Sequence, residues 1–157
     1  MSFLRFLMLL ALIVWIGGLI FFAFGLAPAA FAVLPTTHLA GNIVGRTLAI
    51  LHYMGIFSGL IFLASSLLYS QITRGKPSVL AARNVLIVLM MALTLVSQFG
   101  IMPRMDALRT RLGEVSSVPA DNTARAQFDS LHLWSTRLEG AVLLLGLVVV
   151  YGTAASF

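Results

Sequence analysis

Four long apolar stretches, separated by short polar breaks, dominate the pattern of hydrophobic and polar positions along this chain. No charged residue occurs between Arg5 and Arg46, and none occurs within residues 47–71. Each stretch reaches the length of roughly 20 residues that a helix needs to cross a bilayer. The pattern therefore predicts helices over residues 3–34, 38–71, 80–112 and 121–154.

Short connections between these helices favour an up-and-down arrangement. Residues 73–78 (TRGKPS) are typical of a turn, and Thr36 or Thr37 can cap the second helix. Asp121, Asn122 or Thr123 can cap the last helix. We therefore predict an all-α fold, an integral membrane antiparallel four-helix bundle that forms a single transmembrane domain over residues 1–157.

Two prolines interrupt this pattern, and one segment has an alternative interpretation. Because proline has no N–H and clashes with the preceding turn, Pro28 and Pro103 are each expected to end or kink a helix. The first stretch resembles a signal peptide, since Arg5 precedes it and residues 30–32 mimic a cleavage site. Its apolar core is longer than the about 7–15 residues of a signal sequence. We expect a retained transmembrane helix.

Composition supports the membrane assignment and narrows the chemistry. Hydrophobic residues make up 60% of the chain and charged residues only 10%, whereas soluble domains carry roughly 25% charged residues. The net charge of +5 is typical of membrane topology and of contact with anionic headgroups, and no basic run indicates nucleic acid. The absence of cysteine excludes disulfides and cysteine-ligated clusters.

The predicted topology gathers polar residues at one membrane face. We call it the loop face, because it carries the connections at residues 35–46 and 103–128; the terminal face carries both chain ends. The terminal face holds no histidine and no acid. The residues expected near the loop face are His38, Arg46, His52, Gln98, Met102, Arg104, Asp106, His132, Arg137 and Glu139.

The last helix should contribute most of this chemistry. At helical spacing His132, Ser135, Thr136 and Glu139 share one face, while Arg137 points elsewhere. The stretch from Gly140 onward is about 27 Å long at 1.5 Å per residue, which places Glu139 near the headgroup boundary. His52 is expected to lie deeper than His132. Asp106 can pair with Arg109 one turn further on.

The preferred interpretation of the cluster is a structural or partner-binding clasp. Because burying an unpaired charge is costly, Glu139 is expected to pair with a cation such as Arg46 or Arg104. The polar cluster assigned to this clasp consists of Arg46, Gln98, Arg104, Asp106, Arg137 and Glu139.

Three alternatives compete with the clasp. Haem b could be held between His52 and His132. Copper could bind either histidine together with Met102, Met105 or Met54, because thioether and imidazole suit Cu(I). A substrate-conducting or proton-linked cavity around Glu139 and His132 is the third. Catalysis is not expected, because no acid stands behind His132 to complete a triad with Ser135 or Thr136.

Several motifs together resemble a known family. They are residues 15–22 (WIGGLIFF), 45–46 (GR), 51–55 (LHYMG), 97–108 (SQFGIMPRMDAL), 128–132 (FDSLH) and 135–140 (STRLEG). The chain resembles the bacterial membrane family called domain of unknown function 4149, related to eukaryotic transmembrane protein 205. The resemblance implies a four-helix membrane protein of undetermined activity. A distant similarity to copper-resistance D-like and protoporphyrinogen-oxidase-J-type membrane proteins implies haem or copper by analogy.

Localisation and partners follow from charge and hydropathy. Arg5 precedes the first helix and no cation follows it closely, so we predict a bacterial inner-membrane protein with both termini cytoplasmic. Counting all cations favours the opposite orientation, since the loop face carries six and the terminal face four. The expected partners are the lipid bilayer and a membrane protein or a second copy of the chain.

Overall fold

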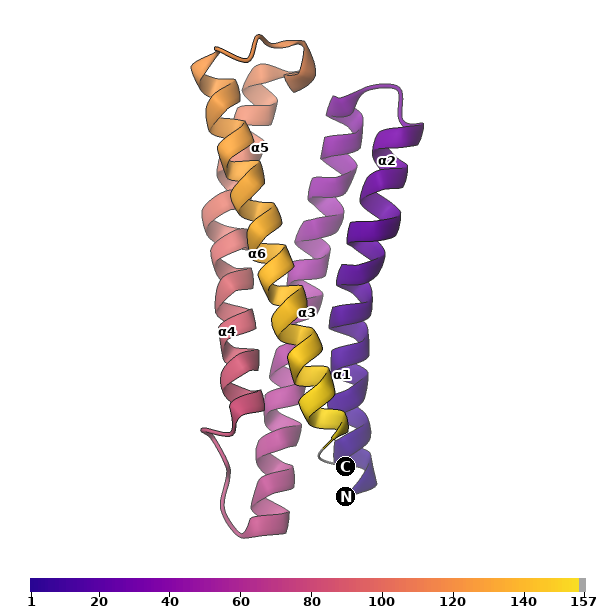
Figure 1. Ribbon diagram of the computed structural model, residues 1–157, viewed down its shortest axis with the longest axis vertical. Coiled ribbons are helices and arrows are strands. Elements are labelled where there is room, and N and C mark those ends of the chain that lie inside the picture. The colour runs from indigo at the N-terminus through magenta and orange to yellow at the C-terminus, as the bar shows by residue number, and fades with distance from the viewer. Residues whose placement is uncertain (156–157) are drawn as a thin grey trace.

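The computed structural model describes residues 1–155, and within them the chain is helical with no β-strand (Figure 1). The first span consists of α1 (Ser2–Phe21), the π-helical turn η1 (Phe22–Leu26) and α2 (Ala27–Val33). The second is α3 (Thr37–Arg74). The third consists of α4 (Ala82–Val96), the π-helical turn η2 (Ser97–Ile101) and α5 (Met102–Leu112). A 3₁₀ turn, η3 (Val115–Ser117), precedes α6 (Thr123–Ala154).

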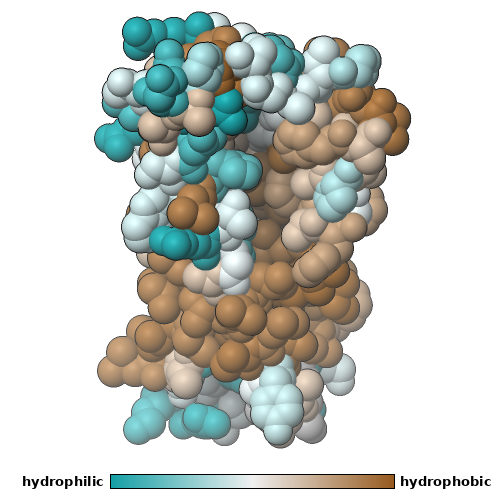
Figure 2. All heavy atoms as spheres, turned by 45° about the horizontal axis from the view of Figure 1, so that its top comes forward, coloured by the Kyte–Doolittle hydropathy of each residue, from teal (hydrophilic) through white to brown (hydrophobic). Residues whose placement is uncertain are grey.

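The predicted fold class is confirmed. By length and composition, 4 helical spans can cross a membrane: Ser2–Val33, Thr37–Arg74, Ala82–Leu112 and Thr123–Ala154. Figure 1 shows them running up and down, with the start of α1 and the end of α6 at the same end of the bundle. On the face shown in Figure 2, apolar residues cover the middle of the molecule and polar residues gather toward its ends. This is the arrangement of an integral membrane bundle.

Local sequence determines the helix ends. The Thr36 side chain accepts a hydrogen bond from the Leu39 N–H at 3.2 Å, and Asn122 accepts from the Ala124 and Arg125 N–H groups. Both are N-caps, which satisfy donors that lack a partner in the first turn. Gly75 ends α3 with a φ of 72°, a left-handed conformation that glycine adopts without steric cost.

Neither proline ends its helix. The helix continues past Pro28 to Val33 and past Pro103 to Leu112. In each case a π-helical turn lies immediately before the proline-containing helix. The π turn thus falls where the proline, which has no N–H, cannot donate the usual helical hydrogen bond. An extra residue in one turn rotates the following face by about 100°, because an α-helix has 3.6 residues per turn. The two π turns therefore set which side chains face the bundle interior.

Glycines on α3 receive side chains from the neighbouring helices. Gly55 lies against the indole of Trp15, and a Cβ atom there would stand 2.7 Å from Cε2 of this ring. Gly59 receives Met91 in the same way, with Sδ at 2.7 Å. These glycines therefore act as notches that receive large side chains from neighbouring helices.

Candidate functional site

A buried hydrogen-bond network joins three of the four spans. His52 of α3 is only 1% exposed. Its Nδ1 lies 2.7 Å from Oε1 of Gln98 in η2, and its Nε2 lies 2.7 Å from Oε1 of Glu139 in α6. Ser97, also in η2, donates its hydroxyl to the same Glu139 oxygen at 3.1 Å. We call these four residues the clasp.

The clasp geometry limits where its protons can be. Because Oε1 of Gln98 can only accept, Nδ1 of His52 carries a hydrogen. Nε2 and the Glu139 carboxyl then share one proton, either as an imidazolium–carboxylate pair or as a neutral pair. Both forms leave the network without net charge. This neutrality makes burial of the group inexpensive compared with burial of a lone carboxylate.

The clasp differs from the predicted one in the cation that it uses. Glu139 pairs with His52, and within residues 1–155 no arginine forms an ion pair with it. Arg46 and Arg104 are exposed, as expected for long cationic side chains that reach toward water. Arg137 is also exposed and lies over the Trp134 ring, 5.5 Å from its centroid. These three arginines of the predicted polar cluster are not part of the clasp.

The two candidate haem ligands are not brought together. Glu139, which contacts His52, lies seven residues after His132 on α6, or about 10 Å along the helix axis. His52 is therefore the deeper histidine, as predicted. Both of its ring nitrogens already have hydrogen-bond partners, so neither has a lone pair free for iron. These residues do not fit a haem held between the two histidines.

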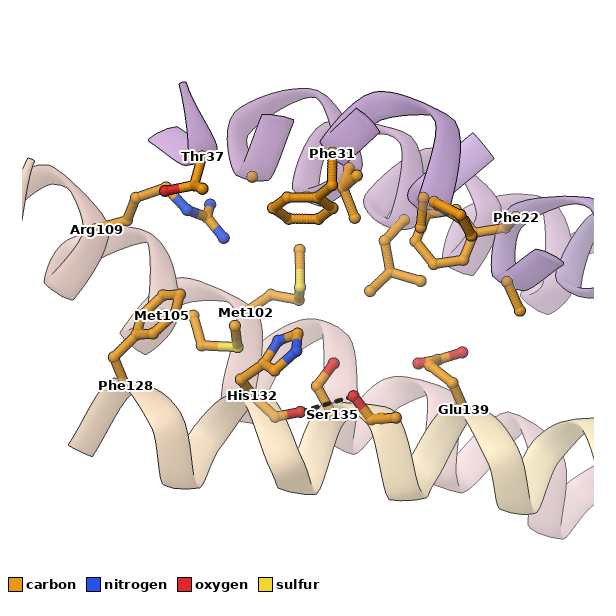
Figure 3. Close-up of a pocket in the computed structure, with 18 of the residues that line it drawn as sticks. Phe22, Phe31, Thr37, Met102, Met105, Arg109, Phe128, His132, Ser135 and Glu139 are labelled. Atoms are coloured by element: carbon orange, nitrogen blue, oxygen red, sulfur yellow. Dashed lines mark hydrogen bonds between the residues drawn. The ribbon is translucent and has the colours of Figure 1, made fainter. Parts of the chain in front are cut away.

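A large chamber adjoins the clasp on the side of the loop face. Its volume is about 700 Å³, and it lies between the hairpin of α1 to α3 and the hairpin of α5 and α6. Figure 3 shows Phe22 and Phe31 on one wall and Phe128, His132, Ser135 and Glu139 of α6 on the other. Glu139 thus belongs both to the clasp and to the chamber lining.

Sequence reasoning missed Arg109 as a site residue. It is 9% exposed and lines the chamber. A Cβ atom on Gly41 or Gly45 would lie 3.2 Å from its guanidinium, so these two glycines make the space that it occupies. Its Nη1 donates to Asp106 at 2.8 Å, the pairing that the sequence predicted. The feature of the sequence that could have indicated this site is the pair Gly41 and Gly45, which lie four residues apart on one helix face.

Aromatic rings support this guanidinium and the chamber wall. Arg109 lies over Phe128 at 5.6 Å from the ring centroid, and the Phe128 ring stacks on His132 with centroids 6.4 Å apart. The exposed His132 points toward the chamber in Figure 3, as do Met102 and Met105.

Both methionines are buried, at 6% and 5% exposure, and line the same chamber. Met54, the other methionine considered for copper, is 42% exposed and is not among the lining residues. Within residues 1–155 no group of three His, Cys, Asp or Glu side chains could hold a metal ion. The soft donors Met102, Met105 and His132 are therefore the candidate ligand set that the chamber offers.

The exposed Arg46 lies at a second cavity near the loop face. This cavity has a volume of about 490 Å³ and is lined by Arg46 together with Asn42, Asp106, Arg109 and Thr110. Asp106 is mostly exposed, at 58% for its side chain. Arg109 separates the two cavities, because it lines both.

A polar strap bridges the two hairpins at the loop-face end of the chamber. The Glu114 carboxylate accepts from the backbone N–H of His38 at 3.1 Å and from the Thr37 hydroxyl, and Nδ1 of His38 lies 2.8 Å from the Gly113 carbonyl oxygen. The hydroxyl of Ser116 is the main cause that lowers the pKa of Glu114, with the N-terminal groups of α3 adding to it. The ionised carboxylate thus links the two hairpins above the chamber.

Comparison with known proteins gives one match. The family model described as "Domain of unknown function (DUF4149)" matches residues 10–114. No curated protein and no solved structure matches the chain.

Proposed function

Because the chain belongs to the DUF4149 family, a family of unknown function, we propose its role from the geometry of its own residues. The protein is a non-enzymatic membrane protein that binds a ligand in the chamber. The clasp is the structural floor of this chamber and holds three spans in register.

One observation carries this proposal: Glu139 serves both features. Its carboxyl group forms hydrogen bonds with His52 and Ser97 of two other spans. Its side chain also lines the 700 Å³ chamber. Cavities of about 300–1,000 Å³ with mainly apolar walls and few polar groups are typical ligand sites. The clasp fixes the distance between α3, η2 and α6 and so prevents these walls from collapsing.

Replacing Glu139 with glutamine tests the clasp. The amide cannot be ionised, so it offers His52 at most a neutral hydrogen bond in place of a charge-assisted one, and we expect the free energy of unfolding to fall by about 1.5–3 kcal/mol. Asp129→Asn is the matched control, because it makes the same chemical change on α6 at an exposed side chain (59%). Unfolding in mixed detergent micelles measures both variants. Equal free energies of unfolding for the two variants would contradict a stabilising role for the clasp.

Copper binding through His132, Met102 and Met105 is the second candidate, supported by their common position on the chamber wall. The resemblance of the sequence to copper-resistance D-like proteins supports copper binding by analogy alone. This candidate predicts about one Cu(I) per chain in purified protein, lost in His132→Ala and kept in the exposed control Met54→Leu. The clasp account predicts no such stoichiometric copper and no Soret band after expression with ample haem. A Soret band lost with His52 would contradict the clasp, because His52 cannot bind iron and keep both hydrogen bonds. Copper lost with His132 would make the metal the ligand of the chamber.

We also propose that the protein lies in a bacterial inner membrane with both termini cytoplasmic. The absence of charge between Arg5 and Arg46 supports this orientation. It would place the strap and the mouth of the chamber on the outer side of that membrane.

A further inference from the structure

We propose that the chamber takes a single-chain amphiphilic anion, with its carboxylate or phosphate head at Arg109 and its apolar chain along α6 toward the clasp. This inference rests on the proposed binding function and names the ligand class. It follows from the shape of the chamber, the distribution of its polar groups and its opening.

The chamber is long and follows one face of α6. The α6 residues that line it are Arg125, Phe128, His132, Ser135, Thr136, Glu139, Gly140 and Leu143. Their spacing of three and four residues describes a single helix face. From Arg125 to Leu143 this face extends about 27 Å, at 1.5 Å per residue. One leaflet of a bilayer core is about 15 Å thick, so an acyl chain and its headgroup both fit along this wall.

The walls of the deeper part are apolar. Leu19 and Phe22 from the first span, Leu48 from α3 and Leu143 from α6 surround the part nearest the clasp. Glu139, the acid at this end, is already occupied by His52 and Ser97. A ligand reaching this depth therefore meets hydrocarbon and needs an apolar chain there.

Unused cationic donors lie at the other end. Asp106 takes one of the five N–H donors of Arg109, and no other hydrogen bond of this guanidinium forms within residues 1–155. Arg125 donates from Nη1 to the Val118 carbonyl oxygen. Its Nε is buried without a hydrogen-bond partner, 3.7 Å from the Asp129 carboxylate. Both arginines line the chamber. A carboxylate or phosphate matches these forked donors, and it would lie at the level of lipid headgroups.

The chamber is open where an amphiphile could enter. Figure 2, in which the loop face is tilted forward, shows a hollow with apolar walls between two parts of the upper molecule. The strap joins these parts only at their ends, through Glu114 and His38. A chain lying in the bilayer can therefore enter from the side, while its head stays near the surface.

The test is equilibrium binding of radiolabelled laurate to the full-length protein in phosphatidylcholine nanodiscs, with empty nanodiscs subtracted. Unlabelled dodecyl phosphate should displace laurate, whereas dodecanol, which has the same chain and no charge, should bind at least about tenfold more weakly. Inorganic phosphate, a head without a chain, should not displace it. Arg109→Gln should remove the preference for laurate over dodecanol, and Arg109→Lys should keep part of it because the charge remains.

A pair of glycine variants tests the chamber itself. Gly140 lines the chamber and Gly152 does not, although both lie on α6 and a Cβ on either meets nothing within 4 Å. Gly140→Leu should abolish binding of both amphiphiles, and Gly152→Leu should leave it unchanged. If laurate and dodecanol bind with equal affinity and neither binds to Gly140→Leu, the proposal of an anionic headgroup is wrong, but the chamber is still a binding site. Binding that is absent, or unchanged in Gly140→Leu, would overturn both.

Discussion

Replacing His52 with leucine is expected to lower the free energy of unfolding by about 3 kcal/mol, because it leaves the Glu139 carboxyl buried without its partner. Breaking a buried pair from one side typically costs about 3–5 kcal/mol. The lower end applies here, since the Glu139 side chain is 15% exposed toward the chamber and Ser97 still donates to it. Gln98 also loses the donor for its carbonyl oxygen.

His132→Leu provides the control for this prediction. His132 is exposed, and its ring stacks on Phe128. We expect its replacement to change the unfolding free energy by less than about 0.5 kcal/mol, as for most exposed positions. Reversible unfolding in mixed micelles measures both variants. A larger loss at His132 than at His52 would mean that the chamber wall, and not the clasp, holds the bundle together.

The second large effect is expected at Gly55. Gly55→Ala places a methyl group 2.7 Å from Cε2 of Trp15, a rigid ring that is 2% exposed. Because neither the ring nor α3 can move without repacking the core, this overpacking should destabilise the bundle by about 1–3 kcal/mol. In membranes this packing matters especially, since helix association lacks the usual hydrophobic driving force.

Gly17→Ala is the matched substitution, because a Cβ there meets nothing within 4 Å. Alanine favours a helix over glycine by up to about 1 kcal/mol, so this variant should be as stable as the natural chain or more stable. The difference between the two melting temperatures isolates the notch that receives Trp15. Similar values for both variants would contradict the packing described for α1 and α3.

Hydropathy was sufficient to predict a membrane bundle of four long apolar helices. A cap among Asp121, Asn122 and Thr123 and the Asp106–Arg109 pair were also predictable, because both depend on residues close in sequence. The convergence of His52, Gln98 and Glu139 followed from topology alone, since the ends of antiparallel helices must meet at the same membrane face.

The choice of partners was not predictable in the same way. Glu139 meets His52 of α3 and Ser97 of the third span, and Ser97 and Gln98 both lie in the π turn η2. Sequence periodicity assumes regular α-helices and gives no relative rotation between neighbouring spans. Arg46 and Arg104 can instead extend to water, which costs less than ion pairing inside the bundle.

A double-mutant cycle between His52 and Glu139 tests the central claim most directly. His52→Leu, Glu139→Leu and the double variant are unfolded under the same conditions, and the coupling energy is the difference between the double loss and the sum of the single losses. The clasp predicts a double variant that loses less than this sum, with a coupling of at least about 1.5 kcal/mol, because two apolar side chains replace a buried pair. Additive losses would contradict a direct bond between the two residues and with it the clasp.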